Sequence, residues 1–293
     1  MTYSIVARDP ETGELGVAVQ SMYFHVGPVV PWAEAGVGAV ATQSLVNVAF
    51  GPLGLDLMRG GLSAEQALAA VLAGDVEAEA RQCAMVDAAG RAAVHTGPNC
   101  IPAAGHRVGD GYSCQANLME RDTVWDAMAA AYEDASGRPL ADRLVAALRA
   151  AEKEGGDIRG RQSAALLLVT GRPAGRPWED RVMDLRVEDH EDPVEELARL
   201  VRLKQAYLAV RVLPGDPDYR ERTLEALRIA PEQAQVRFSA GLMHGRAGEW
   251  EEALSLLRTV LEEEPRWAET LRRMAAVGRV PPELAAEVES RLG

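Results

Sequence analysis

The feature that most constrains this chain is a change of pattern at an acidic run, residues 188–193. Before this run, short apolar stretches rich in β-branched residues alternate with Ala-rich segments whose apolar residues lie three and four apart, which predicts mixed strands and helices. After it, helical periodicity continues almost throughout and is interrupted by prolines. The chain of 293 residues is therefore expected to form two domains, residues 1–190 and 191–293.

The first domain is expected to begin with a β-hairpin. Residues 2–9 and 14–21 are short apolar runs joined by the turn sequence Pro-Glu-Thr-Gly. Further strands are predicted at residues 36–44, 82–87, 91–95, 112–117, 163–170 and 181–187. Helices are predicted at residues 120–136 and 139–154, and from a capping box at Ser63 to about residue 72. This order indicates an α+β fold in which a sandwich of sheets has helices outside.

The second domain has a repeat-like spacing of small residues and proline. Gly241, Ala253 and Pro265 lie twelve residues apart, and the segment that contains them resembles a tetratricopeptide repeat, a helix-turn-helix unit of about 34 residues. The match is imperfect, because His244 and Arg237 stand where the repeat usually has aromatic residues. The resemblance implies a groove for a protein or peptide partner. A plain helical appendage that packs or dimerises is the alternative, and the sequence does not decide between them.

Composition excludes several classes of function. The net charge is −13, and neither half is basic, so no nucleic-acid partner is expected. No stretch approaches the roughly 18 apolar residues of a membrane span, so no membrane partner is expected. The N-terminus lacks the pattern of a secretory signal, and a cytoplasmic location is therefore expected.

No cofactor or metal is expected from the sequence motifs. Nucleotide-binding loops are absent, and the five histidines include no pair at a metal-binding spacing. The acidic run could hold a hard cation, but a solvated linker is the preferred interpretation. Cys83, Cys100 and Cys114 are expected to be buried thiols, while a Cys100–Cys114 disulfide stays an open alternative.

Thr2 is a possible nucleophile. Met1 precedes a small residue, and if Met1 is removed, Thr2 carries a free α-amine at the start of a predicted strand. An α-amine has a pKa of about 7.7–8.0, so it can accept the proton of the threonine hydroxyl near neutral pH. An ordinary N-terminus is the alternative, and if Met1 is retained, Ser4 and Ser21 are weaker substitutes.

Several stretches of the first domain resemble the bacterial and archaeal domain-of-unknown-function 1028 family. They include TYSIVA from Thr2, GVAVQS from Gly16, GVGAVATQ from Gly36, GYSCQAN from Gly111, GGDIRGRQSAA from Gly155 and DLRVEDH from Asp184. That family is similar to the N-terminal-nucleophile hydrolases, which implies a four-layer αββα sandwich and hydrolysis of a small amide through an acyl-enzyme on Thr2. Some members have a C-terminal extension connected with peptidoglycan binding.

On this interpretation the remaining site residues fall into two groups. The expected catalytic residues beside Thr2 are Asn117, as an oxyanion-hole donor, and Asp157, which would orient the amine. The expected substrate-binding residues are Gln43, His95, Thr96, Gln115 and Arg161. Alternatives remain for some of them, because Asp157 and Arg161 could form a local ion pair in a turn, and His95 could be a core histidine.

Two functions are therefore compared. The first is an amidohydrolase acting on a small amide, with helices that dock a partner. The second is a non-catalytic scaffold whose C-terminal helices bind a protein or cell-wall partner. A homodimer is expected by analogy with other sheet sandwiches.

Overall fold

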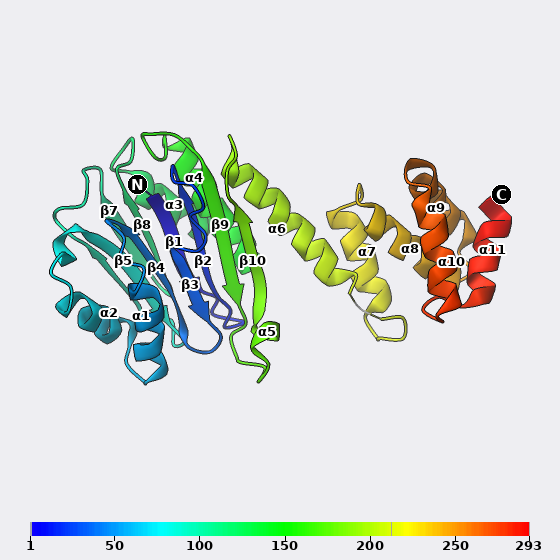
Figure 1. Cartoon of the computed structure of the whole chain (residues 1–293), viewed down its shortest axis with the longest axis horizontal. Coiled ribbons are helices and arrows are strands. Elements are labelled where there is room, and N and C mark those ends of the chain that lie inside the picture. Colours follow the sequence, from blue (N-terminus) through cyan, green and yellow to red (C-terminus); the bar gives the residue numbers. More distant parts are fainter. Residues whose placement is uncertain (1, 212, 293) are drawn as a thin grey trace. The chain divides into compact units, whose positions relative to one another are not determined.

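The computed structural model describes residues 2–211 and 213–292. The chain divides into two compact units, Met1–Val201 and Arg202–Gly293. The first unit combines strands with helices and the second is helical (Figure 1), so the chain is a mixed α+β protein, as the sequence pattern predicts.

The unit boundary lies inside helix α6 (Pro193–Ala209), whereas the sequence pattern places it at residue 190. The first turns of α6 belong to the first unit, where Val194 and Leu197 are buried. Arg149 also donates to Glu195 on this turn, with an Nε–Oε1 distance of 2.6 Å. The acidic run at residues 188–193 therefore lies within the first unit, before the boundary after Val201.

Six antiparallel strands form the larger sheet, in the order β10-β9-β2-β1-β8-β7. The strands are β1 (Thr2–Arg8), β2 (Leu15–Ser21), β7 (Gly105–Gly109), β8 (Tyr112–Asn117), β9 (Ser163–Val169) and β10 (Arg181–Val187). The predicted N-terminal hairpin is confirmed, because β1 pairs with β2. Its turn is closed by the Asp9 carboxylate, which accepts hydrogen bonds from the backbone N–H groups of Glu11 and Thr12.

Four antiparallel strands form the smaller sheet, in the order β3-β4-β5-β6. They are β3 (Pro31–Glu34), β4 (Gly38–Ser44), β5 (Arg81–Asp87) and β6 (Ala92–Thr96). The predicted strand ending at Ser44 and the predicted β5–β6 hairpin are confirmed. Strands β3 and β7, in contrast, were not predicted, because they are short and one contains Pro31 while the other begins and ends with glycine.

The two sheets share one apolar cluster. Val6, Val17 and Val19 of the larger sheet pack with Ala41 and Ala84 of the smaller sheet. Side chains alternate between the two faces of a strand, so every second residue of β1, β2, β4 and β5 enters this interior. At the end of the strands that carries Thr2 and Ser44, the interior side chains become polar.

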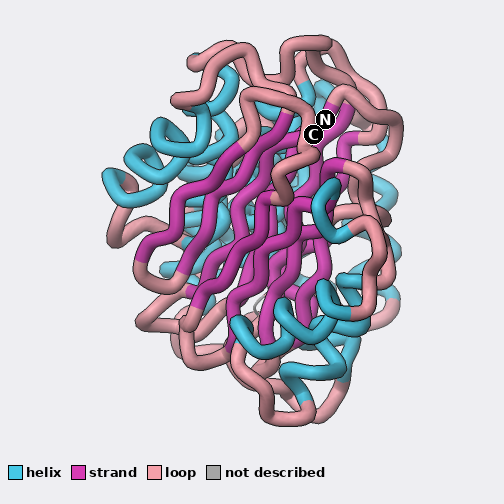
Figure 2. Tube along the Cα trace, turned by 90° about the vertical axis from the view of Figure 1, so that its left-hand side faces the viewer, coloured by secondary structure: helices cyan, strands magenta, loops and turns pink. Residues whose placement is uncertain are grey.

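Helices cover the outer face of each sheet, and the tube view shows them on both sides of the strands (Figure 2). Helices α1 (Phe50–Arg59) and α2 (Ala64–Ala73) pack on the smaller sheet, and α3 (Val124–Asp134) and α4 (Leu140–Lys153) pack on the larger one. The predicted capping box of α2 is confirmed: Ser63 accepts from the Gln66 N–H, and Gln66 accepts from the Ser63 N–H. Two short helices are η1 (Ala78–Ala80) and α5 (Pro177–Asp180).

The second unit contains α7 (Tyr219–Ile229), α8 (Ala234–Arg246), α9 (Trp250–Glu263), α10 (Arg266–Ala276) and α11 (Pro282–Leu292). Helices α8 and α9 cross closely at Gly241, where an added Cβ would lie 2.6 Å from Leu257 Cγ. Ala253 on α9 is fully buried. The crossing therefore requires small residues at two of the three positions with the twelve-residue spacing.

Three further observations concern metals, thiols and membranes. Over residues 2–211 and 213–292, no group of three or more His, Cys, Asp and Glu side chains could hold a metal ion. The three cysteines are buried free thiols, so the disulfide alternative does not apply. No helix in the described part of the chain has the length and apolar character needed to span a bilayer.

Candidate functional site

Thr2 lies on a central strand at the polar end of the interior. Strand β1 runs between β2 and β8, so Thr2 pairs with Ser21 on one side and Asn117 on the other. The Thr2 Oγ1 atom lies 3.0 Å from Ser21 Oγ, and the residue is only 6% exposed. The strand register thus fixes the Thr2 hydroxyl beside a second hydroxyl group.

The backbone carbonyl of Thr2 is held by two side-chain amides. It accepts from Gln43 Nε2 at 3.2 Å and from Asn117 Nδ2 at 3.3 Å. The same two amides also donate to Gln82 Oε1, at 2.7 and 2.8 Å. Both hydrogens of Asn117 Nδ2 are therefore used within the protein, while Asn117 Oδ1 is buried and has no partner among the described residues.

These amides belong to a continuous buried network. Gln115 accepts from Ser113 and donates to Ser4 at 2.7 Å, and Ser4 donates to Gln43 at 2.6 Å. From Gln82 the network continues to Thr96 at 2.9 Å. Ser4, Gln82 and Gln115 are fully buried. A connected polar network in the interior favours one arrangement of its members, and Gln43 of the smaller sheet and Asn117 of the larger sheet both hold the Thr2 carbonyl.

The network ends at a histidine near the surface. Thr96 Oγ1 lies 2.8 Å from Nδ1 of His106, whose pKa is lowered mainly by burial and also by His95. His95 itself lies beside the carbonyl of Ala78, at 2.8 Å from Nε2. Thr96 thus belongs to the network that reaches Gln43, whereas His95 contacts neither Thr2 nor the network directly.

A cavity of about 200 Å³ opens beside Thr2. Its lining residues are Thr2, Ser21, Tyr23, Val26, Val29, Val30, Gln43, Ser44, Val46 and Arg159. Polar side chains from β1, β2 and β4 form one end, and the 23–30 segment forms most of the apolar wall. The cavity contains Thr2 and Gln43 of the predicted site residues.

Asp157 is paired with Arg159, which replaces Arg161 as the arginine of this region. Arg159 donates to the Asp157 carboxylate from Nε at 3.1 Å and from Nη2 at 2.8 Å. The buried carboxylate also accepts from the N–H of Met22, the residue after Ser21. Asp157 is therefore next to the strand end that carries the partner of Thr2. The turn therefore contains a local ion pair of Asp157, but with Arg159 and not with Arg161 as the alternative interpretation had it.

Arg161 lies in a different cluster. It forms ion pairs with Glu152 of α4 and with Asp192, the latter at 3.7 Å. Glu152 in turn accepts a hydrogen bond from the hydroxyl of Tyr3, which alternates with Thr2 and therefore points to the other face of the sheet. Burial raises the pKa of Tyr3 well above its ordinary value and also raises that of Glu152. The structure thus separates Arg161 from the Thr2 cavity.

Ser44 and Gln82 are site residues that the sequence reasoning missed. Ser44 lines the cavity with a backbone φ of +70°, a conformation that is strained in residues other than glycine. No sequence signal identifies it, because Ser44 simply ends an apolar strand. Gln82 had a weak signal, since it alternates with Ala84 and Val86 and is therefore a polar side chain on an inward face.

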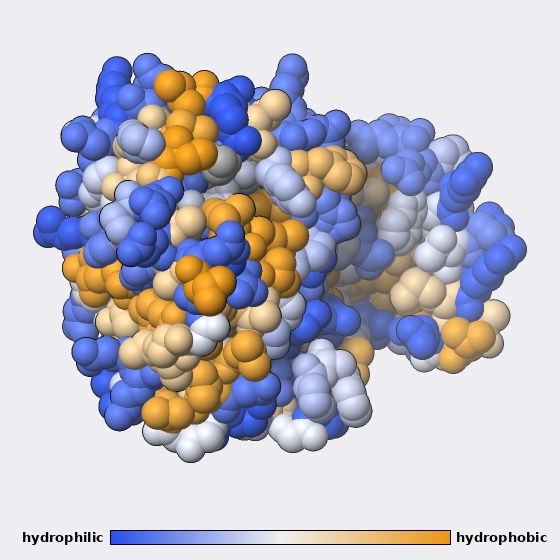
Figure 3. All heavy atoms as spheres, turned by 60° about the vertical axis from the view of Figure 1, so that its left-hand side comes forward, coloured by the Kyte–Doolittle hydropathy of each residue, from blue (hydrophilic) through white to orange (hydrophobic). Residues whose placement is uncertain are grey.

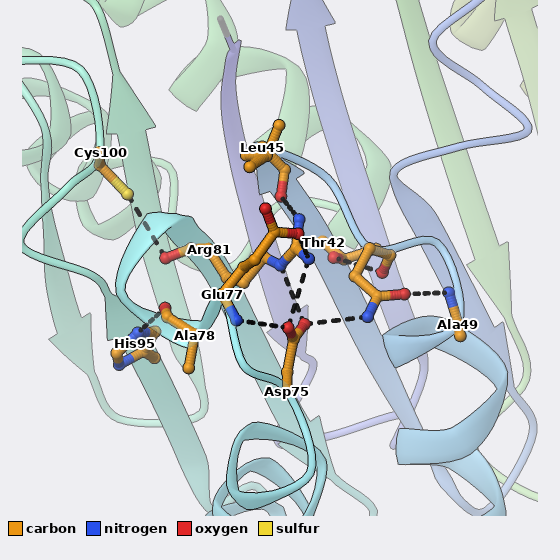
Figure 4. Close-up of polar contacts among 10 residues, drawn as sticks. Thr42, Leu45, Ala49, Asp75, Glu77, Ala78, Arg81, His95 and Cys100 are labelled. Atoms are coloured by element: carbon orange, nitrogen blue, oxygen red, sulfur yellow. Dashed lines mark hydrogen bonds and ion pairs between the residues drawn. The ribbon is translucent and has the colours of Figure 1, made fainter.

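A second polar cluster holds the loop after Ser44 (Figure 4). Arg81 Nη1 donates to the Leu45 carbonyl at 2.6 Å, and Arg81 Nε donates to Asp75 at 2.9 Å. Asn47 Nδ2 donates to the same carboxylate at 3.0 Å. Hydrogen bonds from Arg81, from Asn47 and from the N–H of Glu77 hold the pKa of the Asp75 carboxyl well below its usual range. This cluster fixes residues 45–49, which carry Val46 to the cavity.

The fold and the site define a class: an α+β protein whose two antiparallel sheets enclose a buried amide network and a cavity beside Thr2. The chain belongs to the family of unknown function DUF1028, whose profile matches residues 2–197. A crystal structure of protein SPO2555 from Silicibacter pomeroyi, from the same family, is 31% identical, with a TM-score of 0.62. The match covers 74% of this chain and 88% of that one. A comparison with curated proteins gave no match.

Proposed function

We propose that this protein is an amidohydrolase of the N-terminal-nucleophile type, which cleaves a small amide through an acyl-enzyme on Thr2. The observation that carries the proposal is the position of Thr2. Its hydroxyl lies on a central strand, in the wall of a cavity of about 200 Å³ and 3.0 Å from Ser21 Oγ. A reactive hydroxyl needs this combination of a fixed backbone and access to a small molecule.

The chemistry requires Thr2 to be the first residue; Met1 lies outside the described residues. Thr2 Oγ1 attacks the substrate carbonyl carbon while its proton moves to the α-amine. The C–N bond then breaks, and the α-ammonium returns this proton to the leaving amine. Water attacks the resulting ester and gives a proton to the α-amine. The C–O bond to Thr2 Oγ1 then breaks, Oγ1 takes this proton back from the α-ammonium, and the acid is released. The Asp157 carboxylate, paired with Arg159, accepts from the N–H of Met22 and so holds the backbone next to Ser21, the strand partner of Thr2.

The negative charge that develops on the carbonyl oxygen needs a hydrogen-bond donor. Asn117 does not supply one in this arrangement, because its two N–H hydrogens are directed at Thr2 O and Gln82 Oε1. Ser44 is the better donor, since it lines the cavity and its strained backbone is typical of functional sites. Asn117 and Gln43 then act as positioning residues that hold the Thr2 carbonyl.

The arrangement of sheets and helices supports the proposal at the level of the fold. Helices α1 and α2 pack on one sheet, helices α3 and α4 pack on the other, and the two sheets share an interior. An αββα sandwich of this type agrees with the proposed class. In the second unit, the close approach of Gly241 and Leu257 supports a tetratricopeptide-like helical hairpin, for which we propose a protein or peptide partner.

The test uses protein whose first residue is shown by intact mass to be Thr2, screened against small amides. Thr2→Ala should lower kcat by at least about 10³-fold, because it removes the nucleophile. Thr2→Ser keeps a hydroxyl at the same position and should retain measurable turnover. Equal turnover of Thr2→Ala and the unsubstituted protein would overturn the proposal.

A further inference from the structure

The cavity beside Thr2 has two chemically different parts. Its polar end consists of Thr2, Ser21, Gln43 and Ser44, and its wall consists of Tyr23 and four valines, Val26, Val29, Val30 and Val46. Valine side chains have restricted rotamers, and Val26 and Val30 are also packed in the core between the sheets. The wall is therefore a preformed apolar surface that begins next to the proposed nucleophile.

The cavity lining carries little charge that would oppose an apolar ligand. Of the described lining residues, Arg159 alone is charged, and its guanidinium is paired with the Asp157 carboxylate. At the polar end, Gln43 donates to Thr2 O and to Gln82 Oε1. A ligand with a polar carbonyl at one end and an aliphatic chain at the other matches this distribution.

We propose that this cavity is the acyl subsite and that it selects amides of short, uncharged aliphatic acids; this inference rests on the proposed function. The carbonyl lies at Thr2 and Ser44, and the chain lies along the valine wall. At roughly 30 Å³ for a water-sized group, a cavity of about 200 Å³ holds about six such groups. The preferred acyl groups are therefore close to butyryl and hexanoyl in size.

The surroundings of the cavity favour the same class of substrate. Tyr23 and Val46 line the cavity and are 54% and 37% exposed, so the wall continues to the surface. Adjacent residues in the two segments, Phe24 and Leu45, are exposed to 59% and 52%. Apolar side chains also gather in patches on the face of the first unit shown in Figure 3. An amide with an aliphatic chain can thus remain in apolar contact as it enters.

The first experiment measures kcat/KM for p-nitroanilides with straight acyl chains from acetyl to octanoyl. Burial of one methylene contributes a factor of about four. We expect kcat/KM to rise about fourfold for each added methylene until the cavity is filled, and to fall beyond that length. A succinyl analogue, which carries a charge at the chain end, should be a poorer substrate than butyryl.

The second experiment changes the size of the subsite. Val29 is only partly buried, so Val29→Ala and Val29→Phe are suitable variants. Val29→Ala should move the preferred chain to a longer acyl group, and Val29→Phe should move it to a shorter one. Val108→Phe, on the exposed β7 strand outside the cavity lining, is the matched control and should leave the preference unchanged.

A binding measurement separates this inference from the proposed function. Thr2→Ala is titrated with hexanamide and acetamide by NMR. Tighter binding of hexanamide that is weakened by Val29→Phe supports the subsite even if no amide is hydrolysed. Hydrolysis through Thr2 with no dependence on chain length or on Val29 overturns the subsite and leaves the proposed function intact. Absence of both binding and hydrolysis overturns both.

Discussion

At the scale of single residues, the site depends on how hydrogen bonds are shared among neighbours. Asn117 lies directly beside Thr2, but Gln82 uses one of its hydrogens and the Thr2 carbonyl uses the other. A residue can therefore lie in the site without contacting a substrate. Ser44 lines the cavity in a strained conformation, so it can contact a substrate directly, whereas Asn117 cannot donate to one.

Replacement of Ser44 by glycine should raise the stability of the protein and lower its activity. Ser44→Gly removes the strain at φ +70° and should raise the free energy of unfolding by up to about 1 kcal/mol. It also removes the hydroxyl, so kcat should fall by about 10²-fold. Urea unfolding and amide hydrolysis measure the two effects. Ser44→Ala keeps the strain and should lose only activity; wild-type kcat in Ser44→Ala would exclude the hydroxyl as donor.

The sequence predicted the residue types of the site better than their partners. Thr2 was named from its position after Met1, and Gln43 and Asn117 as amide side chains in family-like motifs; both amides donate to the Thr2 carbonyl. The pairing of Asp157 with Arg159 rather than Arg161 was not predictable, since both arginines follow Asp157 in the same glycine-rich turn. Which of the two turns toward the carboxylate depends on backbone conformation, which residue spacing does not fix.

At the scale of elements, the loop after β4 depends on an ion pair that is nearly buried. The Arg81 and Asp75 side chains are 9% and 8% exposed. Arg81 also holds the Leu45 carbonyl, and Asn47 joins the loop to Asp75. The position of Val46 in the cavity wall is therefore coupled to these two charges.

The coupling predicts a specific pH dependence. The folded-state pKa of Asp75 lies well below its ordinary value because of hydrogen bonds from Arg81, Asn47 and the Glu77 N–H. As the pH falls, Asp75 is thus protonated in the unfolded chain before it is protonated in the folded protein. The contribution of Asp75 to folding stability is therefore present above about pH 4 and is lost below it. Asp75→Asn should weaken the loss of stability between pH 5 and pH 2, measured by urea unfolding.

The partner variant gives an independent check of the same pair. Arg81→Gln removes the main cause of the lowered Asp75 pKa. Like Asp75→Asn, it should therefore make the free energy of unfolding fall less steeply between pH 5 and pH 2. Both variants should also reduce turnover, because the loop that carries Val46 loses its attachment. If the free energy of unfolding fell as steeply between pH 5 and pH 2 in Asp75→Asn as in the unsubstituted protein, this account would be contradicted.

In the second unit, two glycines of α8, Gly241 and Gly245, allow the close contact with α9 to be tested by a substitution and its control. Gly241→Ala places a Cβ 2.6 Å from Leu257 Cγ, so the helices must move apart, which costs about 1–3 kcal/mol. At Gly245 the nearest atom is Leu284 Cδ1 at 3.1 Å, the end of a flexible side chain. Gly245→Ala should therefore be neutral, or stabilising by up to about 1 kcal/mol through helix propensity.

Hydrogen exchange of the α8 and α9 peptides in the full chain measures this difference. Faster exchange in Gly241→Ala than in Gly245→Ala is the expected result. Equal protection in the two variants would mean that the helices do not need the close approach at Gly241.

At the scale of the whole molecule, periodicity predicted the α+β class and the helical character of the C-terminal part. The elements that escaped prediction include helix α1 and the short strands β3 and β7. The two strands are stabilised by pairing with β4 and β8 rather than by their own sequence. The first compact unit extends to Val201, because the start of α6 is buried in it, and such burial is a tertiary effect that periodicity does not show.

The central claim is that Thr2 forms an acyl-enzyme, and trapping with an aliphatic β-lactone tests it most directly. Attack by Thr2 Oγ1 opens the ring, and the released alkoxide takes up the proton, so the whole lactone stays attached. In protein that begins at Thr2, we predict one hydroxylamine-labile adduct on the N-terminal peptide, absent from Thr2→Ala. No adduct, or an equal ester adduct in Thr2→Ala, would contradict the account.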